Sequence, residues 1–212
     1  MWAVVGTAGR KDDAPLMSKE LFDKAYAALL ELEEEYAIES YVSGGAAWMD
    51  HLVVRRALNA NRLEHQVGDS VIFRTHPGHV QLHLPCPMNI LNNKAVFIAG
   101  KGCPGQHIRA ANYYHEGFSQ RIYGNKYQTR MEILDAIRLG LDPLFGMTVT
   151  CESGGGFFGR NGRVASDATD GLIAFTFSDT GAPKDGGTMA TWQEHFKIHP
   201  SKPRIHVDLG GL

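Results

Sequence analysis

The sequence has few cysteines and no long apolar run, and each shortage excludes a class of protein. The three cysteines are widely spaced and form no C-x-x-C pair, so we expect no disulfide framework and a reducing, cytoplasmic compartment. No segment approaches the roughly 20 apolar residues that span a bilayer. The first apolar run begins at Trp2, which leaves no room for a signal peptide. The sequence therefore predicts a soluble protein with no membrane partner.

An excess of charge of one sign is also absent. The formal net charge is −2 over 212 residues, which argues against a broad basic surface for nucleic acid. The hydrophobic content of 43% is enough for a packed core, and the length fits one domain. We expect a single domain that covers residues 1–212.

Short apolar runs that end in glycine-rich turns are the most informative feature. Each turn is followed by a helical pattern, and the three turns are Gly6-Thr7-Ala8-Gly9-Arg10, Ser43-Gly44-Gly45-Ala46 and Asp185-Gly186-Gly187-Thr188. Glycine lets the backbone turn sharply and approach a ligand closely. The helix N-terminus behind such a turn offers unpaired N–H groups to phosphate or carboxylate. We expect the three loops to converge on one pocket.

Hydrophobic periodicity gives the fold class. Helices are expected over 19–35, with Ser18 as N-cap, and over 46–59, 105–121, 126–139 and 187–197; strands are expected over 36–42, 80–84, 147–150, 171–177 and 203–208. The nearly continuous apolar run at 171–177 is typical of a parallel strand buried on both faces. The alternation predicts an α/β fold with a doubly wound, mainly parallel sheet flanked by helices, Rossmann-like. Ligands of such sheets bind at the carboxyl ends of the strands.

With its loops placed, the chain resembles the SLOG superfamily, which includes Smf-type DNA-processing proteins and LOG nucleotide phosphoribohydrolases. The matching motifs follow the family's order: Val5 to Arg10, Val42 to Ala46 with Asp50, Leu84-Pro85, Arg160-Asn161, Asp170 to Phe175, and Gly186 to Thr188 with Thr191. Residues 60–78 and 88–106 look like insertions. The resemblance implies a nucleotide-binding domain.

The resemblance also implies roles for the three loops. Gly6, Thr7, Ala8, Gly9 and Arg10 would line the base or ribose side. Ser43, Gly44, Gly45 and Ala46 would present backbone N–H groups, and Pro85 would lie at the pocket edge. Gly186, Gly187 and Thr188 would cradle phosphate. From the residues themselves, Arg160 before Asn161, in a loop that leads into a buried strand, suits bidentate phosphate binding.

One departure from the LOG pattern concerns catalysis. LOG-type enzymes carry a glutamate three residues after the threonine of a longer glycine signature, and this sequence has Thr191 there. Glu194, one helical turn further on, and Asp50, near the start of its helix, are the remaining acid–base candidates. For Asp50, an ordinary acid at a helix N-terminus and a contact to a ligand hydroxyl or to the neighbouring loop are equal alternatives.

Three functions stay open. The first is a sensor or sponge that binds a nucleotide-derived molecule, such as an ADP-ribose-like or cyclic nucleotide signal. The second is an enzyme of the same pocket, a nucleotide N-glycoside hydrolase or transferase that uses Glu194 or Asp50. The third is an Smf-type single-stranded DNA-binding module, which the low positive charge disfavours. The first is preferred, with no cofactor.

Other side-chain groupings give weaker signals. No set of histidines has four-ligand zinc spacing: His195 and His199 are a helical turn apart, but Pro200 ends that helix. We expect no metal site. Cys86, between two prolines, is expected to be a small buried residue, with a thiol nucleophile as the alternative. The helical segment 105–139 carries several aromatic residues that could form a dimer interface, so a homo-oligomer stays open.

Overall fold

The computed structural model describes residues 1–65, 79–141, 146–151, 155–184 and 186–212. Its centre is a six-stranded sheet in the order β6-β3-β2-β1-β7-β8, and every neighbouring pair is parallel. The strands are β1 (Trp2–Gly6), β2 (Ser40–Ser43), β3 (His79–Leu84), β6 (Met147–Cys151), β7 (Gly171–Thr176) and β8 (Arg204–Asp208). The predicted Rossmann-like α/β class is confirmed.

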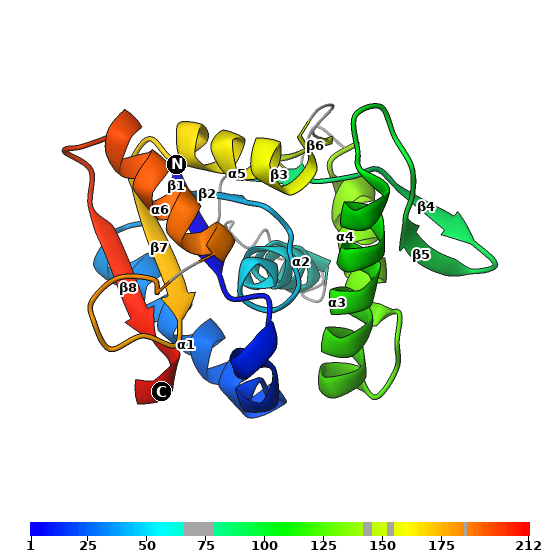
Figure 1. Cartoon of the computed structure of the whole chain (residues 1–212), viewed down its shortest axis with the longest axis horizontal. Helices are drawn as coiled ribbons and strands as arrows, with labels where there is room; N and C mark the ends of the chain where they lie inside the picture. Colours follow the sequence, from blue (N-terminus) through cyan, green and yellow to red (C-terminus); the bar gives the residue numbers. More distant parts are fainter. Residues whose placement is uncertain (66–78, 142–145, 152–154, 185) are drawn as a thin grey trace.

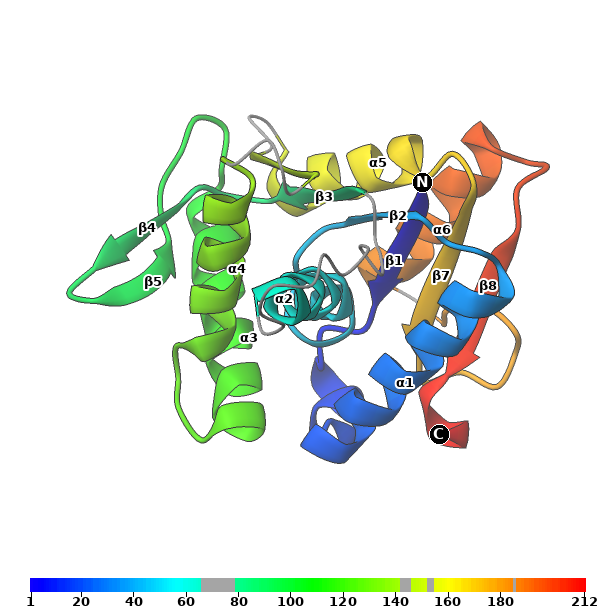
Figure 2. The same ribbon diagram turned by 180° about the vertical axis from the view of Figure 1, so that it is seen from behind.

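The sheet is covered by helices on both faces, as Figures 1 and 2 show. The helices α1 (Lys19–Glu35) and α2 (His51–His65) pack on one face, and α5 (Gly156–Asp167) and α6 (Gly186–Ile198) pack on the other. Helix α1 begins where predicted, because the Ser18 side chain accepts a hydrogen bond of 3.0 Å from the Leu21 N–H. A short 3₁₀ helix, η2 (Trp48–Asp50), precedes α2.

The two faces have different cores. Long apolar side chains from α1 and α2, such as Phe22, Leu29 and Leu52, fill the first face together with Tyr41 from the sheet. The opposite face packs small side chains, such as Ala3 and Ala174, against α5 and α6. All six residues of β7 are buried, as predicted for a strand covered on both faces.

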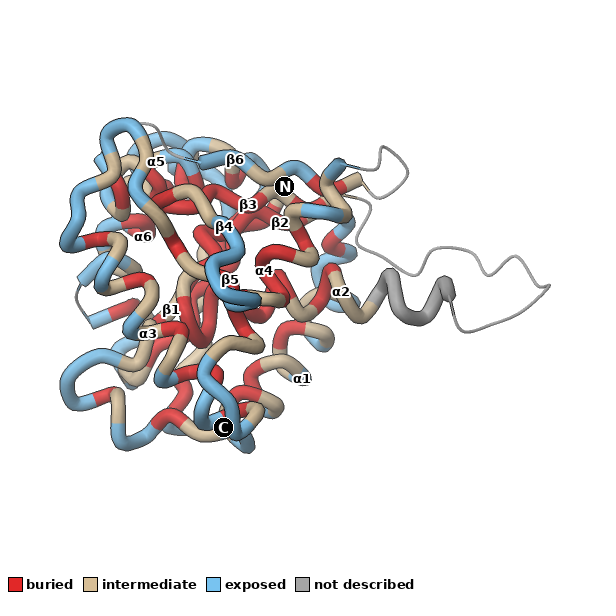
Figure 3. The backbone as a smooth tube through the Cα atoms, turned by 90° about the vertical axis from the view of Figure 1, so that its right-hand side faces the viewer, coloured by how far each residue is buried: buried red, intermediate tan, exposed pale blue. Residues whose placement is uncertain are grey.

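A second layer lies beyond α2. Helices α3 (Gly105–Tyr123) and α4 (Gln128–Leu139) run side by side there, and an antiparallel hairpin of β4 (Met88–Leu91) and β5 (Lys94–Phe97) packs on their outer side (Figure 1). Figure 3 shows the tip of this hairpin exposed in front of the buried sheet. Among the residues described, no helix has the length and apolar character needed to cross a bilayer.

Three expectations about secondary structure were wrong. No helix or strand was expected between the strand at 80–84 and the helix at 105–121, but this segment contains the hairpin, whose turn places Asn92 and Asn93 at positive φ, as a two-residue hairpin turn requires. The second strand begins at Ser40, because α1 continues to Glu35 and the chain then turns through Ala37, at φ 48°. The segment from Arg160 is helix α5 rather than mainly a loop. Most of the expected insertion at 60–78 lies outside the described residues.

Candidate functional site

A pocket opens at the carboxyl ends of β1, β2 and β3, the edge where the sequence placed the ligand. It encloses about 270 Å³, including its open mouth. Its lining comes from the loops after these strands, from β5, from one side of α3 and from the start of α5: Ala8, Arg10, Gly45, Ala46, Ala47, Pro85, Phe97, Ala111, Tyr114, His115, Phe157 and Arg160. Two of the three predicted loops therefore meet here, and α3 adds a wall that the motifs did not indicate.

The first two loops are joined by Asp50 beneath the pocket. Its carboxylate is 4% exposed and accepts a 2.9 Å hydrogen bond from the Gly6 N–H, and the Ala46 N–H also donates to it. Burial raises the pKa of Asp50, while the charge of Arg160 and these hydrogen bonds oppose the shift. The Asp50 side chain thus holds the β1 and β2 loops in register and does not line the pocket.

The hydroxyl groups of these loops also bond inside the protein. Ser43 Oγ lies 2.8 Å from the carbonyl oxygen of Val4 and is fully buried. Thr7 Oγ1 donates to Asp13 at 2.6 Å and accepts from the Gly9 N–H at 3.2 Å. The ligand-facing contribution of these loops is consequently backbone and small side chains.

Arg160 is the buried cation of the pocket. It lies on the second turn of α5 and is only 8% exposed. Its guanidinium donates to the Gly44 carbonyl at 3.4 Å and to Asn161 Oδ1 at 2.9 Å and 3.2 Å. A Cβ on Gly44 would lie 2.7 Å from Arg160 Nε, so the glycine makes room for this side chain. Burial lowers the pKa of Arg160, and Arg10 lowers it further against the opposing charge of Asp50.

Aromatic rings lie between the two arginines. The guanidinium carbon of Arg10 is 4.8 Å from the ring centre of Tyr114 and 5.7 Å from that of Phe157, and that of Arg160 is 5.2 Å from the Phe157 ring. Arg10 is exposed. Phe157 is oriented by His107, whose Nδ1 accepts its N–H at 3.2 Å. The pocket therefore offers two cations and two flat rings at its mouth.

His115 closes the inner end. It is 1% exposed, and its Nε2 lies 3.1 Å from the Gly45 carbonyl oxygen. Burial holds the pKa of His115 well below its usual range, and the neighbouring His51 acts in the same direction. Behind it, His51 Nε2 is 2.8 Å from Glu132 Oε2. Both histidines are packed residues, the role that the sequence favoured for them.

The third glycine loop supports the pocket from outside the lining. Thr188 Oγ1 donates to the Gly6 carbonyl at 2.9 Å, and Asn161 Nδ2 donates to the Gly187 carbonyl at 3.4 Å. Gly186 begins α6, and Asp185 lies outside the described residues. Glu194, two turns along α6, is 43% exposed and pairs with Lys197 at 3.1 Å. It is not among the described residues that line the pocket.

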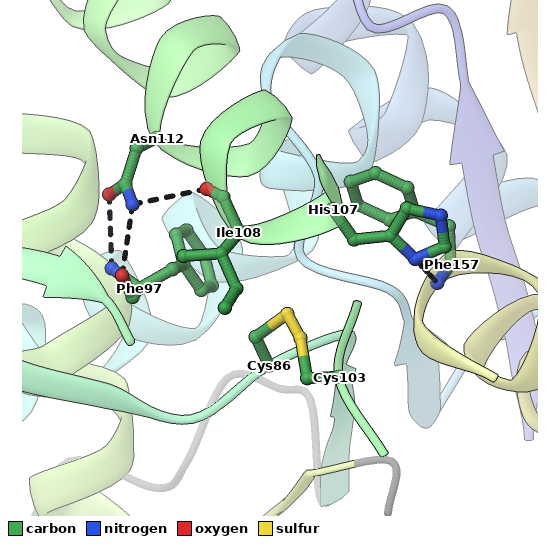
Figure 4. Close-up of a disulfide and its surroundings, with 7 residues drawn as sticks. All are labelled: Cys86, Phe97, Cys103, His107, Ile108, Asn112 and Phe157. Carbon is green, nitrogen blue, oxygen red and sulfur yellow. Dashed lines mark hydrogen bonds between the residues drawn. A yellow bond between two sulfur atoms is a disulfide. The ribbon is translucent and has the colours of Figure 1, made fainter. Parts of the chain in front are cut away.

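A disulfide joins Cys86 and Cys103, so the expectation of no disulfide was wrong (Figure 4). The hairpin returns the chain to its starting point and brings the two Cα atoms to 5.7 Å. Cys86 directly follows Pro85, and Cys103 lies two residues before Gly105, where α3 begins. The disulfide therefore ties one pocket wall to another, and Cys86 has no free thiol for nucleophilic chemistry. The described residues contain no group of three His, Cys, Asp or Glu side chains suited to a metal.

Comparison with known proteins identifies one family. The chain is 34% identical over 216 residues to the uncharacterized protein R261 of Acanthamoeba polyphaga mimivirus, and the match covers 98% of this chain and 96% of the viral protein. No protein-family model and no solved structure matches the chain. The chain belongs to the same family as the mimivirus protein.

Proposed function

We propose that this protein binds a nucleotide or nucleotide-derived small molecule in the pocket between the β1 and β2 loops, as a sensor or sponge. The observation that carries the proposal is the state of Arg160. Its guanidinium is buried, and no carboxylate among the described residues hydrogen-bonds to it. The charge of Asp50 offsets part of the cost of burial, and a second cation, Arg10, adds repulsion. An anionic group bound between the two arginines would offset both costs.

The aromatic rings and the loops of small residues favour a ligand that carries a flat ring in addition to an anionic group. Arg10 lies over the Tyr114 ring and Arg160 over the Phe157 ring, and such layers of guanidinium and aromatic planes suit stacking of a base. Ala8, Gly45 and Ala46 allow a ligand to approach the backbone.

Binding without turnover is favoured over hydrolysis by the positions of the two acid–base candidates. A general acid or base must reach the proton that it transfers directly or through one water. Asp50 is committed to backbone N–H groups beneath the loops, and Glu194 pairs with Lys197 outside the pocket lining. If the enzyme alternative holds, Glu194→Gln or Asp50→Asn abolishes product formation while the ligand still binds.

The test begins with native mass spectrometry of the purified protein, followed by identification of any released molecule. A thermal-shift and calorimetry panel of adenosine, AMP, cyclic AMP and ADP-ribose then separates the contributions of ring and phosphate. We expect AMP or ADP-ribose to bind more tightly than adenosine, and Arg160→Gln to remove that difference.

Arg204→Gln is the matched control. Arg204 also stacks on aromatic rings, with its guanidinium carbon 4.9 Å from Trp192 and 4.2 Å from Phe196, but it lies on β8 and lines no part of the pocket. Equal binding of all four compounds to wild type and Arg160→Gln, or no binding of any of them together with an empty protein in the native spectrum, would refute the proposal.

A further inference from the structure

A second cluster of reactive side chains lies on the opposite face of the sheet, away from the pocket. His83 on β3 is 5% exposed, and its Nδ1 is 2.6 Å from Thr150 Oγ1 on the neighbouring strand β6. Its Nε2 is 2.8 Å from Asp167 Oδ2 at the end of α5. Residues Val80, Leu82 and Leu84 of β3 face the large core, so the alternating His83 faces α5.

The hydrogen bonds fix the proton positions on His83. Asp167 is a carboxylate acceptor, and it also accepts from the Gln81 side-chain amide at 2.8 Å. In the tautomer whose Nε2–H donates to the Asp167 carboxylate, Nδ1 accepts from the Thr150 hydroxyl. Gln81 Nε2, which also lies 3.1 Å from His83 Nε2, then donates to Asp167 and not to the ring. Gln81 and Asp167 together orient the imidazole.

The order hydroxyl, imidazole, carboxylate is the arrangement that activates an oxygen nucleophile. The hydroxyl end is accessible: Thr150 is exposed on β6, an edge strand paired only with β3. The imidazole is buried behind it, where its orientation is held by packing. Three elements far apart in the sequence are needed to build this arrangement, and the pocket described above uses none of the three side chains.

We propose that Thr150, His83 and Asp167 form an acyl-transfer site for small carboxylic esters. Thr150 Oγ adds to the ester carbonyl carbon, and its proton moves to His83 Nδ1. The carbonyl re-forms as the ester C–O bond breaks, and the leaving alcohol takes the proton from His83. Water then attacks the Thr150 ester with His83 as base, which releases the carboxylic acid and restores the threonine.

The experiment uses p-nitrophenyl acetate with the full-length protein. Release of nitrophenolate is followed by absorbance, and intact-mass and peptide spectra locate the acetyl group. We expect one acetyl group on Thr150. Thr150→Val abolishes acetylation of this position, His83→Gln slows it by roughly 100-fold or more, the magnitude of a general-base contribution, and Thr150→Ser retains it.

Two neighbouring residues supply controls. Thr148 is an exposed threonine two residues earlier on the same strand, so its side chain is on the same face, and Thr148→Val leaves the rate unchanged. Cys151 is an exposed cysteine next to Thr150 that takes no part in the disulfide, and Cys151→Ser likewise leaves the rate unchanged. Acetyl found only on Cys151 or on lysines, or no acetyl on Thr150 together with a rate of nitrophenolate release that Thr150→Val leaves unchanged, would show that the three side chains form a structural hydrogen-bond chain alone.

Discussion

Two regions of this protein each bury an arginine to the same extent but treat its charge differently. Arg56 on α2 and Arg160 on α5 are both 8% exposed. Arg56 donates from Nε and Nη2 to the Glu33 carboxylate at 2.9 Å and 2.7 Å, and Glu33 also accepts from the Tyr41 hydroxyl at 2.9 Å. Arg160 donates instead to a carbonyl and an amide oxygen. The first arginine is neutralised within the fold, and the second retains the capacity to bind an anion.

The pKa shifts of the two arginines follow this difference. Burial alone would lower the pKa of Arg56, but the hydrogen bonds and charge of Glu33 raise it above its usual value. At Arg160 burial prevails and the pKa is lowered. Arg160 lies deeper among protein atoms than Arg56 and lacks a hydrogen-bonded carboxylate among the residues that the structure describes, so its charge is less well compensated. This is the pattern expected of a residue placed for binding rather than for stability.

The largest effect is expected from breaking the paired region. Arg56→Leu leaves the Glu33 carboxylate buried without its main partner, and we expect a loss of about 3–5 kcal/mol in the free energy of unfolding. Urea denaturation measures this loss. The double variant Arg56→Leu, Glu33→Leu should recover most of it; a double variant as unstable as the single one would show that packing of the arginine stem, and not its charge, is decisive.

The pocket region should depend on its disulfide. Cys86→Ser opens a loop that spans 17 residues, and we expect a loss of about 3 kcal/mol. Thermal denaturation with and without reductant measures it, and Cys151→Ser, at the cysteine outside the disulfide, is the control. A wild-type melting temperature that is insensitive to reductant would mean that the disulfide does not form in solution.

A smaller effect on stability, with a clear effect on binding, is expected at Arg160. Arg160→Gln removes a buried charge without leaving a hydrogen-bonded carboxylate behind, so the unfolding free energy should change less than in Arg56→Leu. Loss of charged hydrogen bonds worth about 1.5–3 kcal/mol should weaken AMP binding roughly 10- to 100-fold, measured by calorimetry. Stability losses of equal size in Arg160→Gln and Arg56→Leu would abolish the distinction between the two regions.

The smallest effect is the pH dependence at the inner end of the pocket. The pKa of His115 is lowered in the folded state by burial, so below pH about 6.5 the unfolded chain binds a proton that the folded protein does not. The free energy of unfolding should therefore be independent of this group above that pH, and should fall by up to about 1.4 kcal/mol per pH unit below it. Urea denaturation between pH 8 and 5 tests this, and His115→Gln should flatten the dependence. An unchanged slope would assign it to other histidines, such as His195, whose pKa burial also lowers.

Local sequence patterns were sufficient to predict much of this fold, because the alternation of strands and helices and the helix caps depend on residues that are close together in the sequence. Helix α1 and its Ser18 cap, and the buried strand β7, lie where periodicity placed them. The hairpin was missed because β4 is short and mostly exposed, although its Asn92-Asn93 turn was a usable signal. The disulfide depends on that hairpin, so it could not be inferred from the spacing of Cys86 and Cys103.

The candidate site was harder to predict because α3 and α5, which form part of its wall, are distant in the sequence from the β1 and β2 loops. The β1 and β2 loops, Pro85 and Arg160 were identified from motifs and line or touch the pocket. No local sequence pattern marks Tyr114, His115 and Phe157 as ligand contacts. An aromatic residue in a helical segment is more often part of the hydrophobic core. Only the packing of α3 and α5 against each other, through the His107–Phe157 bond, brings them to the strand ends.

The position of β1 in the middle of the sheet bears on how the chain folds during synthesis. One edge of β1 pairs with β2, and the other edge pairs with β7, which comes much later in the sequence. The pairing of Ala3 with Leu172 can therefore form only after β7 has been synthesised. Such contacts between distant residues slow folding. Until the ribosome has made β7, an apolar strand edge stays unpaired and open to aggregation. The glycine loop at the end of β1, where the Thr7 N–H donates to the Phe175 carbonyl at 3.0 Å, can take its final shape only after β7 has been synthesised.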